Sequence, residues 1–286
     1  MRPTRPLVLY GGALVAAAYL VAPFLWLLLT SLMTEAEALS VPPHWIPEAP
    51  TLANYAFFLR PTGQEALLAA GAALNFPRAM LNSAIVASSV ALINICLGTP
   101  AAYSFARYRF PGDGTLLMAY IASRMVPGVA LMIPLYIVMR HLGLLDTLVA
   151  LIIVDSTFTL PFTIWILKSY FQTIPRDLED AARVDRCNWL QTMVQVFLPV
   201  AKPGIAAAAM FAFMSAWGEF LFALVFSSTS ASKPLTVAVS ELATDISIQY
   251  TLMATSGVIA IIVPLCLALL FQRLIVQGLV AGSVKG

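Results

Sequence analysis

Charged residues are scarce in this chain of 286 residues: they make up 10% of it, whereas apolar residues make up 60%. Soluble domains carry about 25% charged residues. This composition excludes an ordinary water-soluble globular fold and indicates that lipid surrounds most of the chain. The formal net charge is only +2, which argues against nucleic acid as a partner.

Cysteine and histidine are too few and too scattered to build a site. The three cysteines, Cys96, Cys187 and Cys266, lie neither in a CxxC motif nor beside a histidine, and His44 and His141 fall in expected loops. Neither a disulfide framework nor a metal site is therefore expected.

Catalytic and nucleotide-binding motifs are also missing. The sequence contains no HExxH motif, no Ser/His/Asp array and no Gly-rich Walker loop. We therefore expect that the chain is not an enzyme and carries no cofactor of its own. Active transport would have to take its energy from a partner or from an ion gradient.

Long apolar segments are what the chain has in abundance. A membrane-spanning helix needs about 20 such residues. The expected spans are 7–32, 80–106, 115–138, 148–168, 204–226 and 251–276. They predict an all-α integral membrane protein whose six transmembrane helices form a single domain over residues 1–286. The first segment is too long for a signal-peptide core and has no clear cleavage site, so we expect it to be retained.

Lysine and arginine set the expected orientation, because basic residues collect on the cytoplasmic side. With the N-terminus inside, the inner face holds eleven of them and the outer face four, while Arg124 lies within a span. Both termini are therefore expected in the cytoplasm. One long outer segment then covers 33–79, including an interfacial apolar stretch at 66–76, and a shorter one covers 227–250.

Prolines interrupt several of the expected spans. A membrane helix tolerates such breaks where neighbouring groups or a cavity satisfy the freed backbone. The sequence therefore predicts helices bent around a path. These prolines are Pro100, Pro127, Pro134, Pro161 and Pro264.

Three charged residues, Arg124, Asp155 and Glu219, lie well inside expected spans and away from their ends. Each costs about 2.5–3.5 kcal/mol at mid-bilayer, so they should face a cavity or the interior of the bundle. Arg124 and Asp155 could pair with each other, or Arg124 could donate hydrogen bonds to substrate oxygens. Trp217 and Glu219, followed by Phe220, could bind a sugar through a stacking face beside an acceptor, or could form a gate.

The segment 175–203 concentrates charge between apolar segments. It holds four acidic and four basic residues, out of thirty charged residues in the chain. Acidic residues in its first turn suit a helix N-terminus, and Glu179 and Arg183 have the spacing of a helical ion pair. This segment is where the chain is expected to meet a water-soluble partner.

A second helical pattern follows in the same segment. Helical periodicity resumes at Trp189, and Pro199 and Pro203 are expected to stop that helix. The sequence thus predicts two short helices with a turn between them, exposed at the inner face.

Here the sequence resembles a known family. Asp180-Ala181-Ala182, three residues, Arg186, nine residues, Val196, one residue and Leu198-Pro199 follow the EAA loop of ABC-importer permeases. Further blocks in the same order are similar to the carbohydrate-uptake branch: YSFARYRFPG at 103–112, IPLY at 133–136, LPFTIWILKSYF at 160–171 and the C-terminal residues 272–286. Three positions depart from the pattern: Asp180 replaces glutamate, Arg186 replaces glycine, and Gly218 replaces the asparagine of Trp-Asn-Glu.

The resemblance implies a permease subunit of the bacterial inner membrane, paired with a second, related permease. It implies two ATP-binding cassette subunits, which would hold ATP and Mg, and an extracytoplasmic solute-binding protein. An EAA loop over about 171–203 would contact the ATPases. The residues implied for that contact are Glu179, Asp180, Ala181, Ala182, Asp185, Arg186, Leu198 and Pro199. The candidate substrate path comprises Arg124, Asp155, Trp217, Glu219 and Phe220.

One alternative remains open from the residues alone. Asp155 or Glu219 could serve as the proton or sodium site of an ion-coupled secondary transporter. That reading does not account for the exposed helical pair in 175–203. On the outer side, Pro42 to Leu59 and the segment 227–250 are expected to form the docking surface for the solute-binding protein.

Overall fold

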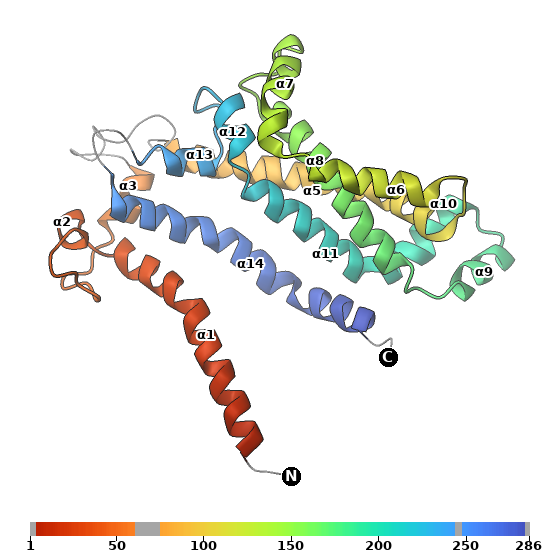
Figure 1. Ribbon diagram of the computed structural model, residues 1–286, viewed down its shortest axis with the longest axis horizontal. Coiled ribbons are helices and arrows are strands. Elements are labelled where there is room, and N and C mark those ends of the chain that lie inside the picture. Colours follow the sequence, from red (N-terminus) through yellow and green to blue (C-terminus); the bar gives the residue numbers. More distant parts are fainter. Residues whose placement is uncertain (1–3, 61–74, 244–247, 284–286) are drawn as a thin grey trace. The chain divides into compact units, whose positions relative to one another are not determined.

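The computed structural model describes residues 4–60, 75–243 and 248–283. Throughout these residues the regular structure is helical, apart from one isolated bridge between Ala243 and Ile248, as Figure 1 shows. The expected all-α class is therefore confirmed. The chain divides into two units, Met1–Ala79 with Val237–Val263, and Met80–Thr236 with Pro264–Gly286.

The first unit is organised by capped helix ends. Helix α1 (Thr4–Ser31) ends at carbonyls that have no partner within the helix. The side-chain amide of Asn54, in α3 (Ala53–Leu59), supplies a donor there. It donates hydrogen bonds to the carbonyl of Ser31 at 2.9 Å and to the carbonyl of Met33, just beyond the helix, at 2.8 Å. The short helix α3 thereby fixes the end of α1.

A second cap joins α2 (Glu35–Ala38) to α14 (Tyr250–Ser283). The Glu35 carboxylate accepts hydrogen bonds from the backbone N–H groups of Tyr250 (2.9 Å) and Thr251 (3.0 Å) and from the Thr251 hydroxyl (2.7 Å). A negative charge is favourable at a helix N-terminus. The carboxylate therefore stabilises the start of the last long helix.

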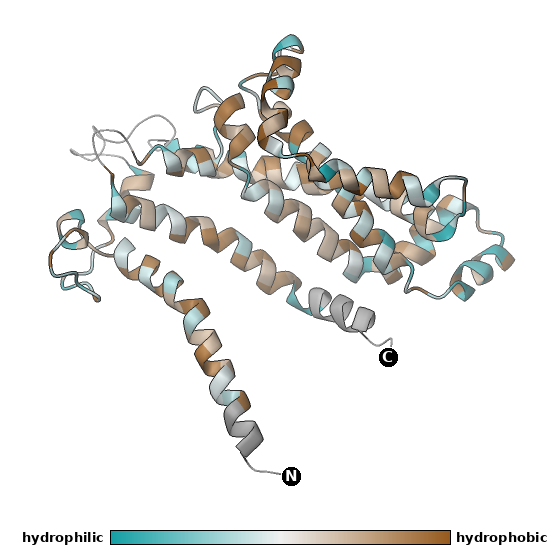
Figure 2. Ribbon diagram, in the orientation of Figure 1, coloured by the Kyte–Doolittle hydropathy of each residue, from teal (hydrophilic) through white to brown (hydrophobic). Residues whose placement is uncertain are grey.

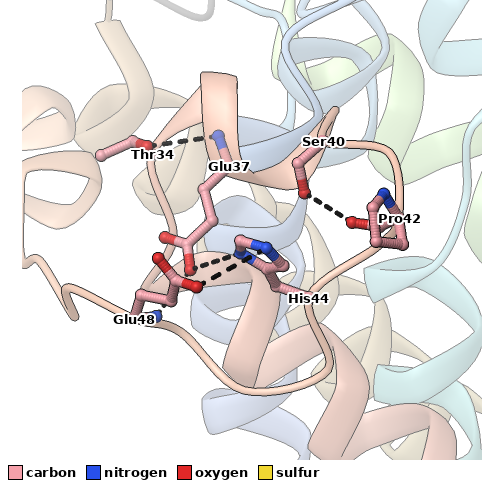
Figure 3. Close-up of polar contacts among 6 residues, drawn as sticks. All are labelled: Thr34, Glu37, Ser40, Pro42, His44 and Glu48. Carbon is pink, nitrogen blue, oxygen red and sulfur yellow. Dashed lines mark hydrogen bonds and ion pairs between the residues drawn. The ribbon is translucent and has the colours of Figure 1, made fainter.

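The expected outer segment also has local order around His44. Its two ring nitrogens lie 3.6 Å from carboxylate oxygens of Glu37 and Glu48, and the Glu48 N–H donates to Glu37 at 2.6 Å, as Figure 3 shows. Residues 61–74, which include most of the expected interfacial stretch 66–76, lie outside the described residues.

The second unit contains most of the remaining helices. They are α5 (Phe76–Arg107), α6 (Asp113–Ala122), η2 (Ser123–Met125), α7 (Gly128–His141), α8 (Leu148–Phe171), α9 (Asp177–Val184), α10 (Trp189–Gln191), the π-helical η3 (Thr192–Phe197), α11 (Leu198–Trp217) and α12 (Leu221–Phe226). Helix α13 (Leu235–Ser240) begins in this unit and belongs to the first unit from Val237 onward.

Close packing of α8 on α11 forms the centre of this unit. Gly204 of α11 faces the Tyr170 ring of α8 so closely that a Cβ atom at position 204 would overlap the ring. Phe197 is 1% exposed and meets the Tyr103 and Phe171 rings edge-on, both at 5.0 Å between centroids. Small residues and interlocking rings of this kind hold membrane helices together where the hydrophobic effect is weak.

Five helices in the described chain are long and apolar enough to cross a membrane: Leu9–Ser31, Phe76–Arg107, Leu148–Phe171, Trp189–Trp217 and Tyr250–Arg273. A sixth span is present if Asp113–Met125 and Gly128–His141, which meet at 94°, are taken together. Figure 2 shows apolar colour along these helices and hydrophilic colour over α9. The expected number of six spans is reached when this bent pair counts as one span, and five spans are present without it.

That bend corrects the expectation of one helix over 115–138. Val126 precedes Pro127 and has extended backbone (ψ 121°). A proline clashes with an α-helical residue before it, so the helix breaks there. Other prolines expected to bend spans, such as Pro100 and Pro161, lie inside helices. Among the described helix pairs that are together long and apolar enough for one span, the pair that meets at Pro127 is the one bent by more than 40°.

The expected span 204–226 is also corrected. The helix does not stop at Pro199 or Pro203 but runs from Trp189 to Trp217. The wide π turn of η3 accommodates Pro199, because a π turn shifts the hydrogen-bond pattern just before the proline that lacks an N–H. The helix instead ends at Gly218, and α12 continues after Phe220.

Candidate functional site

A cavity of about 340 Å³ opens beside the break between η2 and α7. Helices α8, α11 and α12 form its other walls. The side chains that line it include Arg124, Asp155, Phe158, Thr159, Ser215, Glu219 and Phe222. Three expected path residues, Arg124, Asp155 and Glu219, are therefore brought together.

Asp155 is the buried carboxylate of this cavity. It is 5% exposed, and its carboxylate accepts no hydrogen bond from the described residues. The expected alternative of an ion pair with Arg124 is not realised in the part of the chain described: the Arg124 guanidinium lies over the Phe158 ring instead, with Cζ 5.7 Å from the ring centroid. A buried carboxylate without a partner is costly, so Asp155 is open to a hydrogen-bond donor from a ligand.

Glu219 has a different role from Asp155. Its Oε1 accepts the N–H of Phe222 at 2.8 Å and its Oε2 accepts the N–H of Ala223 at 3.0 Å. The carboxylate thus caps the first turn of α12, where a negative charge is favourable. Glu219 lines the cavity, but both of its oxygens are already engaged by the backbone.

Trp217 and Phe220 do not line this cavity. Trp217 is 7% exposed and stacks on Phe213, with 5.7 Å between centroids and 15° between ring planes. The aromatic faces of the cavity come instead from Phe158 and Phe222, which the sequence interpretation missed. The available signal was helical spacing, since each follows a path carboxylate, Asp155 or Glu219, by three residues.

Helix α9 presents two different faces. Glu179 and Ala182 are buried within this chain, at 6% and 4% exposed, although both were expected to contact an ATPase. Asp180 and Ala181 lie on the exposed side. The expected Glu179–Arg183 pair is not formed: Arg183 Nη1 lies 3.5 Å from Asp180 Oδ1, and Glu179 pairs elsewhere.

The turn after α9 has a residue in the left-handed conformation, although Arg186 replaces the glycine of the EAA-loop pattern at that position. Arg186 has φ +60°, and its N–H donates to the Arg183 carbonyl at 3.0 Å while the Cys187 N–H donates to the Ala182 carbonyl at 2.9 Å. These two bonds are the Schellman motif, which glycine usually closes. A left-handed L-residue costs roughly 1–2 kcal/mol, so Arg186 stores strain in this turn.

A polar cluster fixes the segment Ser228–Ser232 to Asp146. The Asp146 carboxylate accepts the N–H groups of Ser228 and Thr229, both at 2.9 Å, and the hydroxyls of Thr229 and Ser232. Burial raises the pKa of Asp146, but these hydrogen bonds outweigh it and lower the pKa to about 2. This part of the expected docking loop is therefore ordered by one carboxylate.

Comparison with known proteins agrees with this architecture. Residues 94–280 match the family "binding-protein-dependent transport system inner membrane component". A sulfoquinovosyl glycerol transport system permease of Agrobacterium fabrum is 36% identical over 266 residues, covering 92% of this chain and 88% of that protein. The trehalose/maltose transport system permease of Thermococcus litoralis is 31% identical over 284 residues, covering 99% of this chain and 98% of that protein.

A solved structure shares the fold. It is the crystal structure of a bacterial ABC transporter involved in the import of the acidic polysaccharide alginate, with a TM-score of 0.77 and 21% sequence identity over 96% of this chain and 98% of that one. The chain described here belongs to the family of binding-protein-dependent transport system inner membrane components. It is a multi-pass permease subunit of an ABC importer, so the ion-coupled alternative has no support.

Proposed function

We propose that this chain forms half of a translocation path for a sugar or sugar-like solute. In this proposal, a second, related permease forms the other half, two partner subunits bind ATP and Mg and hydrolyse ATP, and an extracytoplasmic protein delivers the solute. Both termini face the cytoplasm, in line with the distribution of lysine and arginine. The solute class is supported by relatives named for sulfoquinovosyl glycerol and for trehalose and maltose.

The observation that carries the proposal is the polar cavity within the spanning helices. Asp155 is buried with free acceptor positions, and Arg124 offers hydrogen-bond donors in the lining of the same cavity. Phe158 and Phe222 add apolar ring faces of the kind that contact the C–H faces of a sugar. Ligand sites commonly combine apolar walls with a few placed polar groups.

Uptake by the assembled importer tests the role of the cavity. Asp155→Asn keeps the volume of the side chain but removes charge and one acceptor oxygen, and Arg124→Ala removes the donors. Both variants should lower uptake at least tenfold while complex yield stays within twofold of native. Arg140→Ala, at an exposed position of α7, is the matched control and should transport normally. Native uptake in both cavity variants would refute the proposed path.

We further propose that the exposed face of α9 contacts an ATPase subunit. This face carries Asp180 and Ala181, and the helix is followed by the strained turn at Arg186. A hydrophilic helix projecting from apolar spans is suited to a water-soluble partner (Figure 2).

Substitutions at two neighbouring alanines of α9 distinguish contact with the ATPase from packing within this chain. Ala181→Trp should block assembly with the ATPase while the permease pair still forms, because an overfilled contact is poorly tolerated. Ala182→Trp should instead reduce the yield of the permease itself, since Ala182 is buried within the chain. Normal ATPase recovery with Ala181→Trp would remove α9 from the interface.

Two outer segments are proposed to contact the solute-binding protein, each by itself: Pro42 to Leu59, and the loop 227–250, of which 244–247 lie outside the described residues. Asp146 holds Ser228–Ser232 in place, which would give a docking partner a fixed surface. Deleting Ser228–Ser232 should abolish stimulation of ATPase by the binding protein and leave basal ATPase unchanged. Undiminished stimulation would exclude this loop from docking.

A further inference from the structure

The side chain of Arg107 is buried although Arg107 is the last residue of α5. Its Nε lies 2.5 Å from Glu179 Oε1, and the two side chains are 5% and 8% exposed. Charged side chains are rarely buried this deeply unless they are paired. The pair joins a spanning helix directly to α9.

The same guanidinium holds two further elements. Its Nη2 donates to the Ile174 carbonyl at 2.8 Å, in the link between α8 and α9. Its Cζ lies 4.9 Å from the ring centroid of Phe197 in η3. A planar guanidinium can make these contacts together, whereas the point charge of a lysine cannot. Arg107 thus contacts α9, its preceding link and η3 at once.

Helix α9 needs such external fixing. It has eight residues, Asp177–Val184, and a helix of that length is marginal without tertiary contacts. Its inner face consists of Glu179 and Ala182, while Ala181 on the other side stays exposed. The ion pair therefore anchors the inner face of α9 to the end of α5, beside the buried Ala182.

We propose that Arg107 is a positioning residue that fastens α9 to the end of α5, so that movement of α9 is passed to the spanning helices. The inference rests on the proposed contact between α9 and an ATPase. It differs from that contact because the clamp lies entirely within this chain. Without the clamp, α9 still meets the ATPase, but ATP hydrolysis is no longer converted efficiently into transport.

The test uses the complete importer reconstituted in vesicles, with solute uptake and ATP hydrolysis measured together. Arg107→Met should lower the solute transported per ATP at least threefold. Arg107→Lys, which keeps the charge but not the fork of donors, should give a smaller loss in the same direction. Arg109→Met is the matched control, because Arg109 is exposed and lies two residues further along the chain. Its transport ratio, the solute transported per ATP hydrolysed, should equal that of the native importer.

A double variant separates positioning from folding. Arg107→Met alone leaves the Glu179 carboxylate buried without an opposite charge, with the Tyr103 hydroxyl beside it. Such a loss destabilises a protein, whereas removing both charges is often neutral. The yield of complex should therefore recover in Arg107→Met with Glu179→Met, while the transport ratio stays low. A native ratio in both Arg107→Lys and the double variant would overturn the clamp.

A cross-link distinguishes failure of the clamp from failure of the ATPase contact. Ala181→Cys should cross-link to the ATPase subunit in the otherwise native chain and in the Arg107→Met background. Absence of the cross-link in the native background would refute the α9 contact itself. A normal cross-link together with a native transport ratio in Arg107→Met would refute the clamp alone.

Discussion

Replacement of Glu219 by glutamine distinguishes a helix cap from a solute ligand. In the native chain each carboxylate oxygen accepts one backbone N–H of α12, from Phe222 and Ala223. Glutamine keeps one acceptor oxygen and turns an NH₂ group toward the other N–H. Loss of one charge-assisted hydrogen bond costs about 1.5–3 kcal/mol, and loss of the charge at the helix start adds about 0.3–1 kcal/mol.

The expected total is about 2–4 kcal/mol of destabilisation, or a change of about 30-fold or more in the folding equilibrium of this region. It should appear as a lowered Tm of the assembled complex in lipid nanodiscs, followed by size-exclusion chromatography after heating. Uptake would not distinguish a helix cap from a solute ligand, because loss of order in α12 would also displace Phe222 in the cavity wall.

Asp155→Asn is the matched control for that measurement. It removes a carboxylate from the same cavity, but this carboxylate accepts no hydrogen bond from the described residues. Its Tm should be equal to or above that of the native complex, because no hydrogen bond from the described residues is lost with this carboxylate. The reasoning fails if Glu219→Gln leaves the Tm unchanged, or if Asp155→Asn lowers it by as much.

Three further outcomes follow from single contacts. Because hydrogen bonding lowers the pKa of Asp146 from 3.8 to about 2, the order of Ser228–Ser232 should be complete above pH 3.8 and be lost as the pH falls through about 2. Cleavage of the loop by an acid-active protease should follow that range, and a loop lost above pH 5 would contradict it. Arg186→Gly should stabilise the turn after α9 by about 1 kcal/mol, since glycine adopts φ +60° without strain; an unchanged Tm would argue against strain there. Gly204→Val should destabilise the α8–α11 contact by about 1–3 kcal/mol through overlap with Tyr170, and a native Tm would show that the ring moves aside freely.

The sequence determined the class of this protein. Apolar segments of about 20 residues leave few alternatives to spanning helices, and an intramembrane charge is costly enough to mark a cavity. Arg124, Asp155 and Glu219 do line one cavity. Block-by-block similarity to the permeases was also readable without coordinates, because it depends on residue order alone.

Only the tertiary structure decided what each polar group does. Sequence spacing placed Arg183 beside Glu179, but Arg107 reaches Glu179 from a residue 72 positions earlier and is buried with it. Asp155 and Glu219 looked alike in sequence, yet one lacks a partner and the other caps α12. Hydrogen bonds and ion pairs depend on distances of a few ångströms between segments remote in sequence, and no local pattern specifies those distances.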